Sequence, residues 1–197
     1  MFSTISRKIT QILISCGCIP KEDAKIYSYG FRQLFMMLLN IGITLIIGIM
    51  LNELWQSIVF SLGYIPIRSF AGGYHAKTPH MCTIFSSLMI LIVLLIIKFV
   101  TLSNLLVLLM WIVSSSIILA FSPVQDNHKP LDEIERVVYH NKTIILLILD
   151  SIGIIVSMVF SLRSISYCLV LSLFCLSIML ILGKLKNSFI KKLGTVK

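Results

Sequence analysis

Residues 68–82 concentrate the side chains that could do chemistry. They read RSFAGGYHAKTPHMC, with a thiol at Cys82, imidazoles at His75 and His80, and a guanidinium at Arg68. A cysteine attacks a carbonyl group only as its thiolate, and a nearby imidazole commonly serves as its base. These residue types predict nucleophilic catalysis by Cys82, with His75 as the general base and His80 as the second choice.

Cys82 falls at the predicted start of a helix. Thr78 is a favourable N-cap residue and Pro79 suits the first helical position, so Cys82 would be the fourth helical residue. The positive end of the helix dipole lies there and favours a thiolate. This position sets Cys82 apart from the other four cysteines, Cys16, Cys18, Cys168 and Cys175. The five cysteines together are odd in number and scattered, so they predict no disulfide framework.

The chain must fold back for His75 to reach Cys82. The two residues are seven positions apart, which on one straight helix means about 10 Å, whereas proton transfer needs roughly 3 Å. Gly72 and Gly73 tolerate backbone angles that other residues resist, so we expect a chain reversal after them.

Two other interpretations of this stretch stay open. A cysteine and a histidine beside a membrane segment are often packing or interface residues. His75, His80 and Cys82 also form a set of three zinc-type ligands, but the spacing matches no ordinary zinc pattern and the sequence offers no evident fourth ligand. We therefore expect no metal.

The rest of the chain predicts a membrane setting for these residues. The 197 residues are 57% hydrophobic and only 13% charged, against roughly 25% charged in soluble domains. Long apolar runs of this kind cross bilayers as helices. The composition excludes a water-soluble protein, and the scattered basic residues argue against a nucleic-acid partner.

Six apolar segments predict an all-α polytopic fold in a single membrane-embedded domain covering 1–197. One of them, 54–67, has 14 residues and would extend only about 21 Å against a hydrocarbon core of roughly 30 Å. We expect this second segment to be a short or partly re-entrant helix. The other five are long enough to span, namely 31–51, 83–100, 102–121, 143–160 and 165–182.

The predicted domain comprises an N-terminal region (1–30), a transmembrane bundle (31–183) and a basic tail (184–197). In the first region, residues 2–16 place apolar side chains three and four positions apart. This spacing predicts an amphipathic helix in the membrane interface, and a helix that caps the bundle is the alternative.

The basic residues predict the orientation. If 54–67 crosses the membrane, 15 of the 17 Lys and Arg residues fall on one side, and only Lys98 and Arg163 fall on the other. Without that crossing the split is 7 against 10. Because positive charge favours the cytoplasmic side, we expect six crossings with both termini and the 68–82 stretch cytoplasmic. So much positive charge also favours anionic lipids and an acidic peptide as partners.

Arg68 and Asp150 are further candidates with open roles. Arg68 could hold a substrate carboxylate or a lipid phosphate by a forked hydrogen bond, or it could anchor the chain at the interface by snorkelling. Asp150 lies inside the fifth apolar segment, where a charge is costly. It could line a substrate path or make a structural hydrogen bond to Ser151, Ser157 or a neighbouring helix. If it lined a permeation path, the protein would be a small transporter or channel.

The same stretch resembles a family signature. Arg68, Gly72-Gly73, His75-Ala76-Lys77 and Cys82 look like the motif of the accessory gene regulator B (AgrB) family, and SPV at 122–124 and KPL at 129–131 are also similar. The resemblance implies a membrane cysteine endopeptidase of bacterial quorum sensing, with His75 and Cys82 as the catalytic pair. It marks Arg68, Gly72, Gly73 and Lys77 as supporting or substrate-binding positions.

The resemblance also implies a substrate and a reaction. The substrate would be a pheromone precursor of the AgrD type, with an amphipathic N-terminal helix and a charged C-terminal tail. Cleavage through an acyl-enzyme thioester would let a cysteine or serine of the same peptide close a thiolactone or lactone ring. The family implies a homodimer in the bacterial cell membrane, and this chemistry requires no cofactor.

Overall fold

The computed structural model describes residues 2–74, 78–125 and 132–194 of the 197-residue chain. Within these ranges the chain forms helices and no strand, which confirms the all-α prediction. A short 3-10 helix, η1, joins the first two α-helices. The elements are α1 (Phe2–Ser15), η1 (Lys21–Asp23), α2 (Ala24–Met50), α3 (Leu54–Ala71), α4 (Pro79–Phe99), α5 (Asn104–Phe121), α6 (Glu133–Val159) and α7 (Arg163–Gly194).

Five of the described helices are long and apolar enough to cross a membrane, and these are α2, α4, α5, α6 and α7. They correspond to the five long apolar segments of the sequence, so the protein is a multi-pass membrane protein. The observed helices continue beyond the apolar runs, as α7 does to Gly194. Polar residues that are good helix formers, such as Lys184 and Lys186, extend α7 without interruption.

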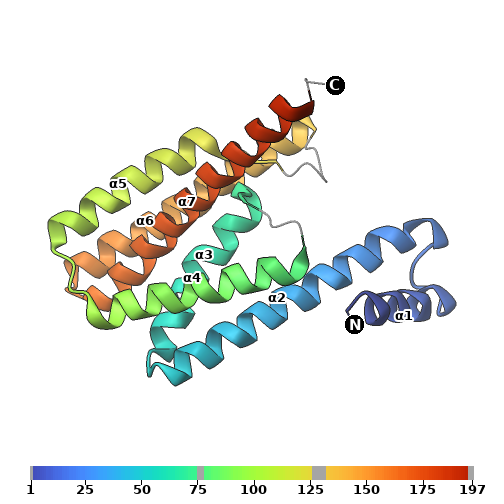
Figure 1. Ribbon diagram of the computed structural model, residues 1–197, viewed down its shortest axis with the longest axis horizontal. Helices are drawn as coiled ribbons and strands as arrows, with labels where there is room; N and C mark the ends of the chain where they lie inside the picture. Colours follow the sequence, from blue (N-terminus) through green and yellow to red (C-terminus); the bar gives the residue numbers. More distant parts are fainter. Residues whose placement is uncertain (1, 75–77, 126–131, 195–197) are drawn as a thin grey trace.

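The second apolar segment forms α3, which is longer than the sequence predicted. It has 18 residues and continues to Ala71, a length of about 27 Å at 1.5 Å per residue. α3 lies inside the bundle between α2, α6 and α7 (Figure 1), and its buried face includes Ser57, Gly63 and Tyr64. Because neighbouring helices cover it, α3 does not need the uniformly apolar surface of a helix that faces lipid.

Close helix packing in the bundle depends on small residues. A Cβ atom on Gly48 of α2 would lie 2.5 Å from Ser57 Oγ of α3, and one on Gly63 would lie 2.7 Å from Ser172 Oγ of α7. Helices that associate in lipid commonly approach each other through such residues. The core around these contacts is apolar and includes Phe60, Ile67, Leu94, Ile118, Ile154, Leu173 and Leu180.

The bundle has two distinct ends. At one end the Lys98 ammonium of α4 donates to Leu51 O at 2.8 Å, and the Tyr167 hydroxyl of α7 donates to Leu102 O. At the other end, α2 and α4 begin, and α3, α5 and α7 end (Figure 1). α3 therefore runs from the first end to the second, as the six-crossing prediction requires.

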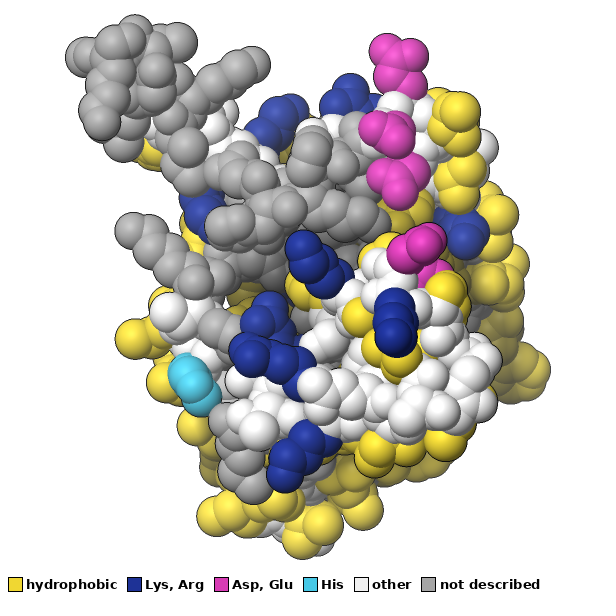
Figure 2. All heavy atoms as spheres, turned by 90° about the vertical axis from the view of Figure 1, so that its right-hand side faces the viewer, with side chains coloured by type: hydrophobic (Ala, Val, Ile, Leu, Met, Phe, Trp, Pro, Cys, Tyr) yellow, Lys and Arg dark blue, Asp and Glu magenta, His cyan; other side chains and the backbone are white. Residues whose placement is uncertain are grey.

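Basic side chains gather on the second end, which faces the viewer in Figure 2. Of the described basic residues in the bundle, Lys98 and Arg163 lie at the opposite end, next to the Leu51 and Ser161 turns. The charge asymmetry that the sequence predicts thus coincides with the two ends of the fold.

The predicted amphipathic helix is present as α1, which packs against α2. The side of α1 turned inward is polar, because Ser6 and Thr10 are buried, whereas Ile12 is 59% exposed. Ile12 is consequently free to contact lipid, and the interfacial position of α1 stays a prediction.

Candidate active site

Cys82 lies in the first turn of α4, as predicted. Pro79 is the first helical residue, and the Thr78 hydroxyl oxygen caps the helix by accepting from Met81 N at 3.4 Å. Cys82 N donates to Thr78 O at 3.1 Å, so Cys82 is the fourth residue of α4. Its side chain is half-buried. The thiol therefore sits at the positive end of a helix dipole that runs into the bundle.

The Gly72-Gly73 pair leaves α3 through backbone angles that favour glycine. Gly72 has φ +74° and Gly73 has φ +129°. Gly72 also lies directly against the segment that follows α5, since a Cβ atom on it would be 2.2 Å from Val124 O. Val124 N donates to Ala71 O at 2.8 Å, which fixes this contact. Both steric space and conformation require glycine at position 72.

α7 holds the other side of this segment. Tyr74 N donates to Met179 O at 2.8 Å. This approach to the helix backbone depends on Gly183, because a Cβ atom on Gly183 would lie 2.8 Å from the carbonyl carbon of Gly73 and 2.9 Å from Tyr74 N. The segment from Gly72 to Tyr74 is therefore fixed between the end of α5 and the part of α7 where Gly183 has no side chain.

Arg68 ties the same segment to α3. Its Nη2 donates to Tyr74 O at 2.7 Å and its Nη1 lies 3.5 Å from Gly72 O. The guanidinium carbon is 5.8 Å from the centre of the Tyr64 ring. The planar fork of arginine spans both carbonyl groups at once. Arg68 thus acts on the backbone of its own loop, and binding of a substrate carboxylate or lipid phosphate by its remaining N–H groups stays a prediction.

Tyr74 brings the end of this segment over the start of α4. Its ring packs edge to face on Phe85, with centroids 6.3 Å apart. Phe85 is three residues after Cys82 and so lies on the same side of α4. The chain has folded back by residue 74, as the sequence predicted. His75 and Lys77 lie outside the described residues, and the pairing of His75 with Cys82 stays a prediction.

His80 is the second residue of α4 and is exposed. Among the ranges that the structure describes, no three His, Cys, Asp or Glu side chains are close enough together to hold a metal ion. The zinc alternative includes His75 and therefore falls partly outside these ranges.

Lysines surround the segment and lie over aromatic rings. Lys142 Nζ is 4.9 Å from the Phe70 ring centre, Lys184 Nζ is 4.0 Å from that of Phe121, and Lys186 Nζ is 5.3 Å from that of Tyr74. These cation–π contacts orient positive charge around the site. The electrostatic setting suits an anionic partner.

A family model described as accessory gene regulator B matches residues 6–180 of this chain. The chain belongs to the AgrB family. Two relatives from Clostridium perfringens are named AgrB-like protein 2 (strain 13) and AgrB-like protein (strain SM101), and they are 26% and 23% identical over 138 residues. The matched part covers 66% of this chain and 64% of each relative. No solved structure matches the chain.

The two motifs that carry the AgrB resemblance meet in space. SPV at 122–124 follows α5, and its valine forms the isolated bridge Gly72–Val124 with the glycine pair. The ring of His140 in α6 lies with Nδ1 3.0 Å from Ser122 O and so braces the same turn. The separate motifs thus form one structural unit. Lys129–Leu131 lie outside the described residues.

Asp150 lies deeper in the bundle, apart from this unit. A Cβ atom on Gly63 of α3 would be 3.1 Å from Asp150 Oδ2. Within the described structure Oδ2 is buried with no hydrogen-bond partner. Neither Ser151 nor Ser157 bonds to Oδ2 in the described structure. Ser151 Oγ accepts from Trp111 Nε1, and Ser157 Oγ donates to Ile154 O. A role for Asp150 in the AgrB site stays a prediction.

The contribution of α7 to this candidate site could not be predicted from the sequence. Met179 supplies a backbone carbonyl, which any residue type could provide, so the identity of this residue could not predict the contact. Gly183 does carry a signal, because glycine is unfavourable inside a helix and often marks close packing.

We expect Gly183→Ala to favour the helix but to displace the segment from Gly72 to Tyr74, and any activity that depends on this segment should fall. A Cβ atom at this position would push on the Gly73 and Tyr74 backbone, and displacing a catalytic segment by about 1 Å can cost about a hundredfold in rate. Gly42→Ala in α2 is the matched control, since nothing lies within 4 Å of its added Cβ atom. Turnover of a precursor peptide and thermal unfolding of both variants check this. Equal turnover in the two variants would show that the contact with α7 is dispensable.

Proposed function

We propose that this protein is a membrane cysteine endopeptidase of the accessory gene regulator system. Its substrate would be an AgrD-type precursor peptide, with Cys82 as nucleophile and His75 as general base. One observation carries this proposal. The segment from Gly72 to Tyr74 is clamped by Arg68 of α3, by α7 and by the turn after α5, and its Tyr74 ring packs on Phe85, three residues after Cys82 in α4.

The reaction follows from the chemistry of a thiolate beside an imidazole. His75 takes the proton of the Cys82 thiol, and the sulfur attacks the carbonyl carbon of the scissile peptide bond. The carbon–nitrogen bond breaks, and the imidazolium returns its proton to the leaving amine of the C-terminal fragment. The N-terminal fragment remains on Cys82 as a thioester.

The thioester can then pass to the peptide's own nucleophile. A cysteine thiol of the bound fragment gives its proton to His75 and attacks the thioester carbon. The bond from this carbon to the Cys82 sulfur breaks, so a thiolactone ring closes and Cys82 leaves as its thiolate. A serine would give a lactone. The peptide thiol must outcompete water, and a site at the edge of the bilayer favours it by holding the groups close and limiting water access.

The charge around the site supports an acidic substrate segment at the cytoplasmic face. The second end of the bundle carries the lysines of α6 and α7 that lie over Phe70, Phe121 and Tyr74. Positive charge flanking membrane segments favours the cytoplasmic side, where a precursor peptide is synthesised.

Trapping of the acyl-enzyme tests this function. The purified protein is incubated with a synthetic precursor and quenched with acid. It should gain the mass of the N-terminal fragment less one water, and this added mass should lie on the peptide that contains Cys82. Hydroxylamine should remove this mass, because it cleaves thioesters. Precursor cleavage without any adduct on Cys82 would contradict the mechanism.

Asp150→Asn separates the endopeptidase from the alternative of a small transporter or channel. Among the described residues, Asp150 Oδ2 has no hydrogen-bond partner inside the bundle, and this observation favours transport. We expect precursor cleavage by Asp150→Asn to equal that of the wild type, because Asp150 lies apart from the clamped segment. The transport function would be favoured if Asp150→Asn lost solute flux in vesicles and the wild type also failed to cleave the precursor.

A further inference from the structure

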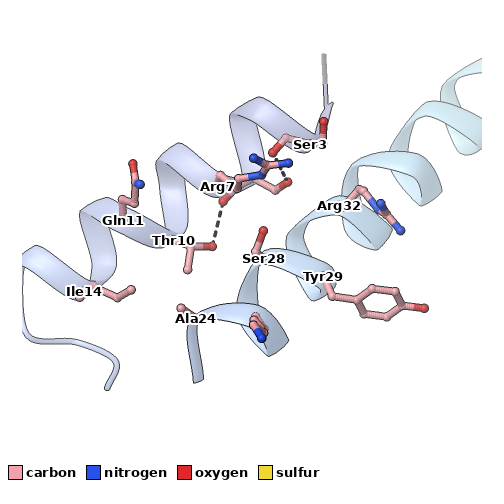
Figure 3. Close-up of a pocket in the computed structure, with 11 residues that line it drawn as sticks. Ser3, Arg7, Thr10, Gln11, Ile14, Ala24, Ser28, Tyr29 and Arg32 are labelled. Carbon is pink, nitrogen blue, oxygen red and sulfur yellow. Dashed lines mark hydrogen bonds between the residues drawn. The ribbon is translucent and has the colours of Figure 1, made fainter. Parts of the chain in front are cut away.

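The hollow between α1 and α2 has an unusual lining for two packed helices. It has a volume of about 430 Å³, within the roughly 300–1,000 Å³ of small-molecule sites. Most of the lining residues are polar or basic by type, and none is Asp or Glu (Figure 3). The lining residues are Ser3, Ser6, Arg7, Thr10, Gln11 and Ile14 of α1, and Ala24, Lys25, Ser28, Tyr29 and Arg32 of α2.

Three cations are among the residues that line this hollow, and no Asp or Glu is among them. Arg7 extends from α1 toward the side of α2 that carries Ser28 (Figure 3). Lys25 and Arg32 are seven residues apart on α2 and so share that side of the helix. The Arg32 guanidinium carbon is 5.7 Å from the centre of the Tyr29 ring. Like charges that face one cavity repel each other, and a bound anion would relieve that repulsion.

The small hydroxyl residues of α1 create the space. Thr10 Oγ1 donates to Ser6 O at 2.8 Å, which satisfies the hydroxyl within its own helix. Because Ser6 and Thr10 are short, α1 and α2 meet without large side chains filling the gap. The arginine and lysine donors, with the Ser3 and Ser28 hydroxyls, match the acceptor oxygens of a phosphate group.

The surroundings of the hollow point to a membrane lipid as the source of that phosphate. Ile26 is 70% exposed, Tyr29 is 59% exposed and Ile12 is 59% exposed. α2 continues from the hollow directly into a candidate membrane span. An aromatic ring beside basic residues at the end of a span is typical of the headgroup level of a bilayer. Acyl chains of a bound lipid would cover the exposed apolar side chains.

We propose that the hollow binds the phosphate group of an anionic phospholipid, with Arg7, Lys25 and Arg32 as its ligands. Such a lipid fixes α1 against α2 at the membrane surface. The site is separate from the clamped segment beside Cys82 and does not depend on the endopeptidase function.

Lipid titration of the full chain in a neutral detergent tests the proposal, with thermal unfolding as the readout. Short-chain phosphatidylglycerol should raise Tm and saturate, and phosphatidylcholine should not. The double variant Arg7→Gln/Arg32→Gln should weaken the apparent affinity for phosphatidylglycerol by roughly tenfold or more. The matched control Lys8→Gln/Lys21→Gln removes the same charge outside the hollow and should bind like the wild type.

Two outcomes would overturn the proposal. Equal loss of affinity in both double variants would mean general attraction between charges, with no site in the hollow. Inorganic phosphate that raises Tm as much as phosphatidylglycerol would show that the lipid is not the source.

Ser28→Asp keeps the test decisive if the arginine variants fold poorly. It places a carboxylate inside the hollow, where it should pair with the cations, raise Tm without lipid and abolish the response to phosphatidylglycerol. An unchanged lipid response in this variant would also contradict the site.

Discussion

Replacing Cys82 with alanine is expected to abolish precursor cleavage, with a loss of at least about a thousandfold. The covalent route has no other nucleophile in the first turn of α4, where Thr78 and Pro79 set the helix start. The variant should fold, because the side chain is half-buried and alanine favours a helix. Cleavage of a synthetic precursor by protein in lipid vesicles, followed by mass spectrometry, measures the loss.

Cysteine replacements elsewhere provide the controls. Cys16→Ala and Cys18→Ala remove exposed thiols that lie beyond α1, and both should cleave like the wild type. Cys82→Ser keeps the shape of the side chain but offers a hydroxyl in place of a thiol, so it should stay inactive or nearly so. Substantial cleavage by Cys82→Ala would mean that the nucleophile lies elsewhere and that the proposed thioester does not form.

The membrane fold could be predicted largely from hydropathy and charge. Five apolar runs became five long helices, and Lys98 and Arg163 lie opposite the basic end. The length of α3 could not be read in the same way. Its last turn before the glycines contains Arg68 and Ser69, which end the apolar run but continue the helix. α3 packs on α7 and α6, and Phe70 in this last turn contacts Tyr139 of α6. Hydropathy along one segment carries no information about such neighbours.

The candidate site was predictable where the signal is local. Thr78 and Pro79 encode a helix start, and Gly72-Gly73 encodes a turn, so the sequence gives both features directly. The partners that hold the turn are distant in sequence. Val124 and Met179 contribute backbone atoms, so the identity of their side chains does not predict these contacts. Only Gly183, an unfavourable residue inside α7, hints at this contact.

The role of Arg68 also depended on structure. The sequence alone is equally consistent with two roles for Arg68, as a ligand for an external anion or as an interfacial anchor. Its carbonyl partners, Gly72 O and Tyr74 O, assign two of its donors to the loop. A buried or half-buried arginine commonly organises backbone in this way, because its five N–H groups have fixed directions. Arg68 is therefore a positioning residue for the segment that leads to His75.

Arg68→Gln should lower the rate of precursor cleavage by about a hundredfold, because the segment before His75 loses both hydrogen bonds and moves relative to Cys82. The loss should fall on kcat, with KM for the precursor nearly unchanged, since the carbonyl partners belong to the loop. Arg68→Lys keeps the charge but cannot span both carbonyl groups, so we expect about a tenfold loss. Arg136→Gln, an exposed change at the same end of the bundle, is the charge-matched control and should cleave normally. If Arg68→Lys restored full activity while Arg68→Gln raised KM, the charge of Arg68 would act on the substrate and its hydrogen bonds to the loop would be secondary.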